Sequence, residues 1–124
     1  MSSEIEQQMH QVEVTIEQCE EQIELAEALQ RLHKNKDFRR IILEDYFEKN
    51  AVRTVMMKSA GGQEGEKEQK NLDNVLIGIG QLGQYFHKIF SFGEGASRAL
   101  ESHRTTREEL LTEELAETSS NLVN

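Results

Sequence analysis

Residues 78–83 read GIGQLG, a literal match to the G-x-G-x-x-G pattern that holds a pyrophosphate in dinucleotide-binding folds. That chemistry needs a buried strand before the first glycine and a helix that begins at the loop, so that backbone N–H groups face the phosphate. Here apolar residues at helical spacing run through the glycines, from Leu72 to Phe90. The motif is therefore predicted to lie inside a helix, and no nucleotide or other cofactor is expected.

Three glycines inside a helix cost roughly 1 kcal/mol each relative to alanine, so another feature should offset that loss. Close approach of a second helix is one such feature, because a residue without a Cβ lets another backbone come near. Gly80 and Gly83 are three residues apart and share a helix face. We therefore expect the closest helix–helix contact at this pair, with a hinge or a helix break as the alternative.

The other side chains that could do chemistry lack the neighbours that the chemistry needs. A di-iron helix places a Glu three residues before a His, and none of the histidines has one: they are His10, His33, His87 and His103. Cys19 is the only cysteine and has acidic neighbours, whereas a reactive thiolate needs a nearby cation. We predict no catalytic residue and no metal site, and the chain is not expected to be an enzyme.

Charge is unevenly distributed along the chain, whose net charge is −9. Residues 1–30 hold eight Glu and no Lys or Arg, residues 31–58 carry +4, and residues 59–124 carry −5. The one strongly basic cluster is RLHKNKDFRR at 31–40. Because the acidic segment before it would repel phosphate, direct nucleic-acid binding is not expected. The cluster is interpreted as a complement to acidic side chains of this chain or of a partner.

Helices must position these residues, because the 124-residue chain has no Pro and is rich in Glu, Gln and Leu. The length fits one domain. The predicted fold class is all-α, with a long N-terminal coiled-coil helix, short helices and a C-terminal helical hairpin. In chain order we expect an acidic coiled-coil helix over 1–35, a short basic helical segment over 36–60, a flexible Gly-rich loop over 61–66, the hairpin over 67–117 and a frayed tail over 118–124.

Local signals divide the later segments further. Asp37 is predicted to cap a first short helix, and Asn50 to separate it from a second. On the first, one face is expected to contain Phe38, Ile41, Ile42 and Tyr46, and the second continues through Val52, Val55 and Met56. The glycines within 91–97 are expected to break or bend the hairpin between helices at 67–91 and 97–117.

The first helix carries the clearest periodic signal. Seven small or apolar residues are spaced alternately four and three apart and form a heptad seam: Ile5, Met9, Val12, Ile16, Cys19, Ile23 and Ala26. The seam then shifts by one residue to Leu25, Leu29 and Leu32. Every e position is a glutamate: Glu6, Glu13, Glu20 and Glu27. This row is either a solvated face or the complement of a basic helix, from residues 31–58 or from another protein.

Two segments, KDFRRIILEDYFEKNAVRTVMMKSA and LIGIGQLGQYFHKIF followed by GEGASRALESH, resemble small Glu-rich helical proteins of tailed bacteriophages. The family pattern I-G-x-L-x-Q-Y-F is matched by Ile79, Gly80, Leu82, Gln84, Tyr85 and Phe86. The similarity covers residues 15–117. It implies a phage origin and a structural or assembly role, but no catalytic or binding residue, because the activity of the family is largely unassigned.

These observations predict a non-enzymatic, oligomeric assembly or virion protein of a phage. Its partners would be copies of itself, other phage structural proteins or a host protein. The alternative is a small acidic inhibitor, a DNA mimic, that binds a basic surface of a host nucleic-acid-processing protein. The expected location is the host cytoplasm during infection and the virion, with no signal peptide and no membrane span. The predicted interface consists of Ile5, Met9, Val12, Ile16, Cys19, Ile23, Leu29, Leu32, Gly80, Gly83, Phe86 and Phe90.

Overall fold

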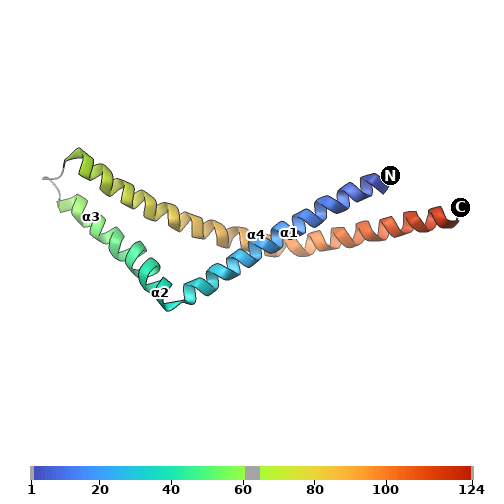
Figure 1. Cartoon of the computed structure of the whole chain (residues 1–124), viewed down its shortest axis with the longest axis horizontal. Coiled ribbons are helices and arrows are strands. Elements are labelled where there is room, and N and C mark those ends of the chain that lie inside the picture. The colour runs from blue at the N-terminus through green and yellow to red at the C-terminus, as the bar shows by residue number, and fades with distance from the viewer. Residues whose placement is uncertain (1, 61–64, 124) are drawn as a thin grey trace. The chain divides into compact units, whose positions relative to one another are not determined.

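The computed structural model describes residues 2–60 and 65–123, and nearly all of them are helical (Figure 1). The elements in chain order are α1 (Ser2–Lys34), α2 (Lys36–Phe38), the π-helix η1 (Arg39–Lys49), α3 (Asn50–Ala60) and α4 (Glu66–Val123). The predicted all-α class is confirmed, and the long N-terminal helix packs against the C-terminal one. Of the predicted loop at 61–66, residues 61–64 lie outside the described residues.

The C-terminal helix corrects two predictions. One continuous helix of 58 residues replaces the hairpin of 67–91 and 97–117, and it also takes in most of the tail that was predicted to fray over 118–124. Gly93 and Gly95 lie inside this helix, and neither has a positive φ. Gly93 lies where a Cβ would overlap the Cβ of Ala26 on α1. This glycine therefore permits close approach of two helices instead of ending one.

The middle helical stretch, residues 36–60, corrects two further predictions. Asn35, not Asp37, caps its start, because the Asn35 Oδ1 accepts a hydrogen bond from the N–H three residues on, at 2.9 Å. Asn50 does not divide the stretch: its φ of −67° and ψ of −39° are helical, and its N–H donates to the carbonyl oxygen of Asp45. That bond spans five residues, as in a π-helix. The stretch is one helix with a π-helical middle.

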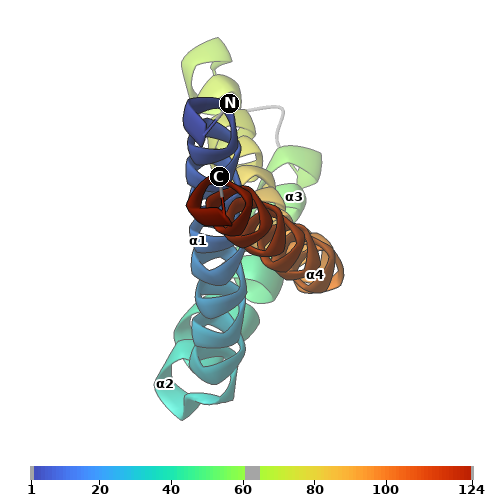
Figure 2. The ribbon, with the colours of Figure 1, turned by 90° about the vertical axis from the view of Figure 1, so that its right-hand side faces the viewer.

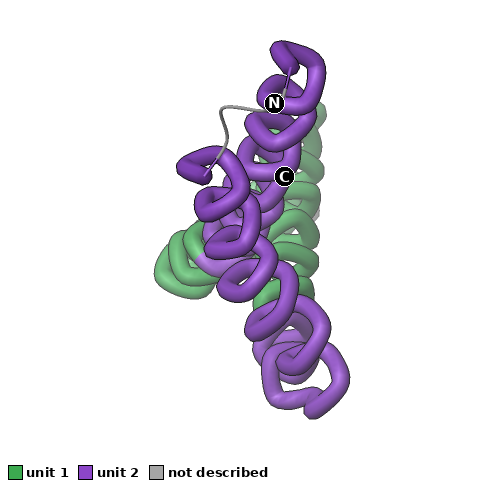
Figure 3. Tube along the Cα trace, turned by 90° about the vertical axis from the view of Figure 1, so that its left-hand side faces the viewer, with its two compact units in different colours: residues 1–26, 91–124 green, residues 27–90 purple. Residues whose placement is uncertain are grey.

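The chain divides into two compact units, coloured separately in Figure 3. Unit 1 contains residues 1–26 and 91–124, from the first part of α1 and the last part of α4. Unit 2 contains residues 27–90, which are the end of α1, the middle helical stretch and the first part of α4. Charge follows this division. Unit 1 has fourteen Glu and three Arg, a net −11, whereas unit 2 has eleven basic and nine acidic residues, a net +2.

Unit 1 is an antiparallel pair of helices, in which the start of α1 and the end of α4 lie at the same end (Figures 1 and 2). Val12 and Ile16 on α1 form a buried cluster with Leu110 on α4, and Met9 and Leu100 pack against it. The inward side of α4 has the same alternating spacing as the α1 seam. Its residues, all buried or half-buried, are Gly93, Ala96, Leu100, His103, Arg107, Leu110, Glu114 and Glu117. The heptad seam of α1 thus meets its partner within the chain.

Unit 2 is a helical hairpin, formed by the middle helical stretch and the first part of α4, with the last turns of α1 beside it (Figure 1). An ion pair between Lys58 and Asp73 joins the two arms. Few of the side chains that the structure describes in this unit are buried: Leu29, Ile79 and Thr54. Two or three helices in contact cannot enclose their side chains as a larger core does, so much of the apolar surface in unit 2 stays exposed.

Candidate interaction surfaces

The glycine motif lies inside α4, in its N-terminal third, and belongs to unit 2. A Cβ at Gly78 would be 3.6 Å from the Tyr46 hydroxyl and one at Gly83 would be 3.8 Å from the ring of Phe47, both ordinary contacts. A Cβ at Gly80 would have no neighbour within 4 Å. Within the chain, the closest approach of two helices is therefore not at Gly80 and Gly83. The motif is also far from any helix N-terminus, so its N–H groups bond within the helix and cannot hold a phosphate.

Aromatic rings form the densest contact in unit 2. The ring of Phe86 on α4 lies 5.7 Å from His33, 6.0 Å from Phe38 and 5.9 Å from Phe47, measured between centroids. His33 also contacts Phe90, at 5.5 Å, and its Nδ1 lies 2.8 Å from the carbonyl oxygen of Leu29. These contacts tie the end of α1 to both arms of the hairpin. His33 is thus a packing residue, and the half-buried Phe86 and Phe90 are covered by the chain's own rings.

The π-helix decides which side of the middle helical stretch turns inward. From Phe38 to Ala51, the half-buried residues are Phe38, Ile42, Leu43, Tyr46, Phe47, Asn50 and Ala51. Each π turn takes in more residues than an α turn, so the inward positions advance by four and five instead of three and four. Ile41, which the α-helical period placed inward, is exposed. The predicted face of Phe38, Ile41, Ile42 and Tyr46 is therefore wrong at Ile41.

The outward side of α3 is apolar. Val52, Val55 and Met56 are 61, 48 and 63 % exposed, and their spacing places them on one face, which we call the α3 outer face. Thr54, on the other side, is only 4 % exposed, and its hydroxyl donates to the carbonyl oxygen of Asn50 at 2.7 Å. The usual distribution is inverted, because this helix turns a polar residue inward and its aliphatic residues outward.

The other predicted interface residues are distributed as follows. Ile5, Val12, Ile16 and Cys19 are buried in unit 1, and Leu29 is buried in unit 2. Met9 and Ile23 are half-buried in unit 1. Leu32 is exposed, although the shifted seam placed it inward, and Leu25 is exposed with it. A second copy would therefore find most of the heptad seam already covered by α4.

The glutamate row on α1 is exposed throughout. One of its members, Glu20, lies 3.5 Å from the guanidinium of Arg104 on α4. Both side chains are about half exposed, so the pair contributes little to stability. The row is therefore largely a solvated face, with one arginine of α4 beside it.

Positive charge gathers where α1 ends and the middle helical stretch begins. We call this segment, residues 31–41, the basic corner; its cations are Arg31, Lys34, Lys36, Arg39 and Arg40, with Asp37 the only acid. All five cationic side chains are exposed. None of them makes an ion pair or a hydrogen bond with another described residue. Leu32 and Ile41 are exposed in the same segment, so the corner combines free cations with aliphatic surface.

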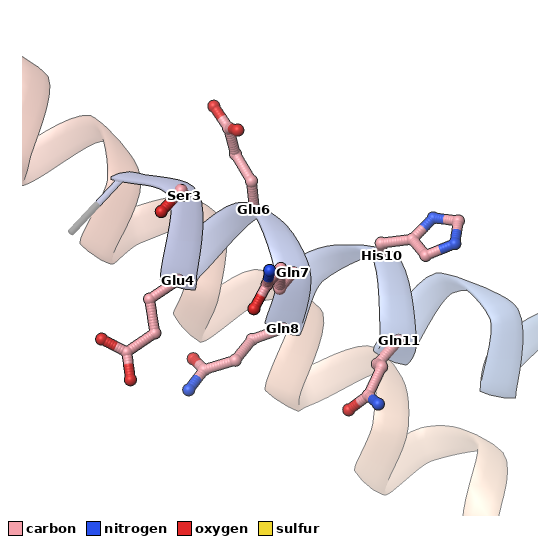
Figure 4. A pocket seen from close by; sticks show the side chains of 7 residues that line it. All are labelled: Ser3, Glu4, Glu6, Gln7, Gln8, His10 and Gln11. Carbon is pink, nitrogen blue, oxygen red and sulfur yellow. The ribbon is translucent and has the colours of Figure 1, made fainter.

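The hollows on the surface are shallow. The one in Figure 4, about 680 Å³, is lined by residues of a single helix, whose side chains point in different directions: Ser3, Glu4, Glu6, Gln7, Gln8, His10 and Gln11. Binding pockets instead have polar groups that converge on a ligand from several elements. A second hollow, about 430 Å³, lies beside the α3 outer face and is lined by Glu48, Lys49, Val52 and Arg53.

No cluster in the described part of the chain has the composition of a metal site, since residues 2–60 and 65–123 hold no group of three or more His, Cys, Asp or Glu that could bind one ion. Cys19 is buried in unit 1. Among these same residues, no helix has both the length and the apolar content of a membrane span. Comparisons of the chain with protein-family models, curated proteins and solved structures gave no match.

Proposed function

We propose that this chain is a non-enzymatic helical assembly protein that associates with copies of itself through apolar surface that the single chain leaves uncovered. The α3 outer face carries the proposal. Burying a Val or Met side chain completely is worth about 1.5–3 kcal/mol, so covering the exposed parts of Val52, Val55 and Met56 would contribute roughly 3–5 kcal/mol. Aliphatic residues on a solvent-facing helix side, opposite a buried Thr, are typical of a surface that meets a partner.

The proposal includes no catalytic step, because the side chains best suited to chemistry are used in packing. Cys19 is buried in the α1–α4 seam, and His33 lies among the rings of Phe38, Phe86 and Phe90. The resemblance around residues 79–86 extends the proposal to an assembly or virion protein of a tailed phage, found in the host cytoplasm and in the particle. Mass spectrometry of purified virions tests that extension, since a protein found only in infected cells would contradict the virion role.

The self-association is tested by making the α3 outer face polar. We expect wild-type protein to have a light-scattering mass that is a multiple of 14.3 kDa, and Val52→Gln combined with Met56→Gln to return the single-chain mass with helicity unchanged. Met57→Gln is the control, because Met57 is also exposed but lies to one side of this face. A wild-type mass of one chain at every concentration would contradict the proposal.

The alternative function, an acidic inhibitor that mimics DNA, draws support from unit 1, whose −11 lies mostly on exposed glutamates. Such an inhibitor would form a salt-sensitive complex with a basic host nuclease or polymerase, because exposed charges are screened by salt. Pull-down from host lysate at low and high salt tests it. If charge reversal on unit 1 abolishes capture of the host protein, whereas the α3 variants still capture it, the inhibitor is favoured over the assembly protein.

A further inference from the structure

The basic corner is a charged surface without a counterpart in its own unit. Its five cations lie within ten residues, all exposed and unpaired among the described residues. His33 and Phe38 turn inward to the aromatic cluster, while Leu32 and Ile41 remain outside. A partner for this corner needs carboxylates or other anions, and aliphatic side chains among them.

Unit 1 displays that combination on α1. Val14, Glu17, Glu21, Glu24 and Leu25 fall on one side of the helix at its 3.6-residue period, and all five are exposed. We call this surface the outer glutamate face. Its three glutamates make no ion pair with a described residue. The seam of α1 packs on α4, so this face is left for contacts outside the unit.

We propose that the basic corner of one copy binds the outer glutamate face of unit 1 in a second copy. Cations meet carboxylates in this contact, and Leu32 and Ile41 meet Val14 and Leu25. Both surfaces occur once in every chain, so their numbers match in any assembly. The contact joins two different surfaces. Two copies can therefore make it twice and form a reciprocal dimer, or each copy can bind the next in an open series. The inference rests on the proposed self-association, but it concerns a different surface from α3.

Charge favours a second copy over nucleic acid as the occupant. A nucleic acid on the corner would gain the five cations, yet a chain with net −9 would repel the rest of its phosphates. The second copy brings its carboxylates on a folded helix, with aliphatic side chains beside them. An exposed ion pair changes a dissociation constant by only about 1.5- to 5-fold, so the charges orient the contact and the aliphatic residues strengthen it.

The test exchanges the charges of the two surfaces. Lys36→Glu with Arg40→Glu reverses two of the five cations of the corner, and Glu17→Lys with Glu21→Lys reverses two of the three carboxylates of the glutamate face. Each double variant alone should weaken self-association by about tenfold or more, because attractive pairs become repulsive. An equimolar mixture of the two should associate again, since the new glutamates of one variant can then meet the new lysines of the other. Sedimentation velocity measures all three, and circular dichroism checks that each variant is folded.

The matched control is Lys67→Glu with Lys70→Glu, which makes the same charge change at exposed positions of α4 in unit 2. It should leave association unchanged, whereas raising salt from about 50 mM to about 500 mM should weaken the wild-type complex. Association that ignores both reversals but is lost in the α3 variant overturns this inference and leaves the proposed function standing. A monomeric wild type overturns both. Binding of a labelled DNA or RNA oligonucleotide, lost on corner reversal without self-association, would assign the corner to nucleic acid instead.

Discussion

Gly93 gives the most direct test of how α1 and α4 pack in unit 1. A Cβ on this residue would overlap the Cβ of Ala26 and lie 3.2 Å from the carbonyl oxygen of Gln22. Neither neighbour can rotate away, because one is a single methyl group on a helix and the other is backbone. We therefore expect Gly93→Ala to destabilise unit 1, although alanine is the better helix former.

The expected magnitude follows from two opposing contributions. Alanine favours the helix by about 1 kcal/mol over glycine. Overpacking a close contact costs roughly 1–3 kcal/mol, and an overlap with a rigid methyl belongs at the upper end of that range. The net loss for Gly93→Ala is therefore about 1–2 kcal/mol. Gly95→Ala makes the same chemical change two residues away, where no atom lies within 4 Å of the new Cβ, and should gain about 1 kcal/mol.

Urea denaturation followed by far-ultraviolet circular dichroism measures both variants. Helix propensity cancels in their comparison, so the difference of roughly 2–3 kcal/mol reports the steric contribution alone. Adding Ala26→Gly to Gly93→Ala should recover part of the loss, because it removes the methyl that the new Cβ meets. If Gly93→Ala proves as stable as Gly95→Ala, then α1 does not approach α4 at this glycine, and the packing described for unit 1 is wrong there.

Three further substitutions test other contacts. Asn35→Ala removes the cap of the middle helical stretch and should lower the free energy of unfolding by about 1 kcal/mol in urea titrations, with Asp37→Ala as a control of smaller effect. Phe86→Ala removes the ring that joins three others and should cost about 3 kcal/mol, with loss of the near-ultraviolet dichroism of the aromatic cluster. Ile16→Asp places a charge in the α1–α4 seam and should reduce helicity, whereas unchanged helicity would contradict the seam.

The long N-terminal helix could be predicted because its seam repeats without interruption from Ile5 to Ala26. Its partner on α4 has the same alternating spacing, but Gly93, Arg107 and Glu114 occupy seam positions there. Hydrophobicity alone does not reveal a seam with glycine, arginine and glutamate in it. The spacing of Gly93, Ala96 and Leu100 was the available signal of this second seam. The prediction that Gly93 and Gly95 break the helix concealed it.

The middle helical stretch shows a second limit of periodicity. A 3.6-residue period places Ile41 with Phe38 and Ile42, whereas the π-helix turns Leu43 and Phe47 inward in its place. Hydrogen bonds that span five residues leave no distinct pattern in residue type. The helix itself was therefore predictable, but the side that it presents to solvent was not.

The sequence placed the close approach of two helices at the wrong glycines of this chain. Gly80 has open space around its missing side chain, so no close contact offsets its cost in the helix. Gly93, which the sequence offered only as a break, is the glycine that another helix approaches. Close approach depends on the residue opposite, here Ala26, and the register between two helices was not fixed by either sequence segment alone.

Charge also limits how copies of this protein can meet. Two unit 1 surfaces face to face would bring −11 against −11, and repulsion between exposed charges persists over a Debye length of about 8 Å at physiological salt. Unit 2 carries only +2 and exposes Val52, Val55 and Met56 on α3. On the proposed function, a contact between copies must therefore include unit 2 on at least one side. If the basic corner meets the outer glutamate face as proposed, the same charge asymmetry sets which surface of one copy meets which surface of the next.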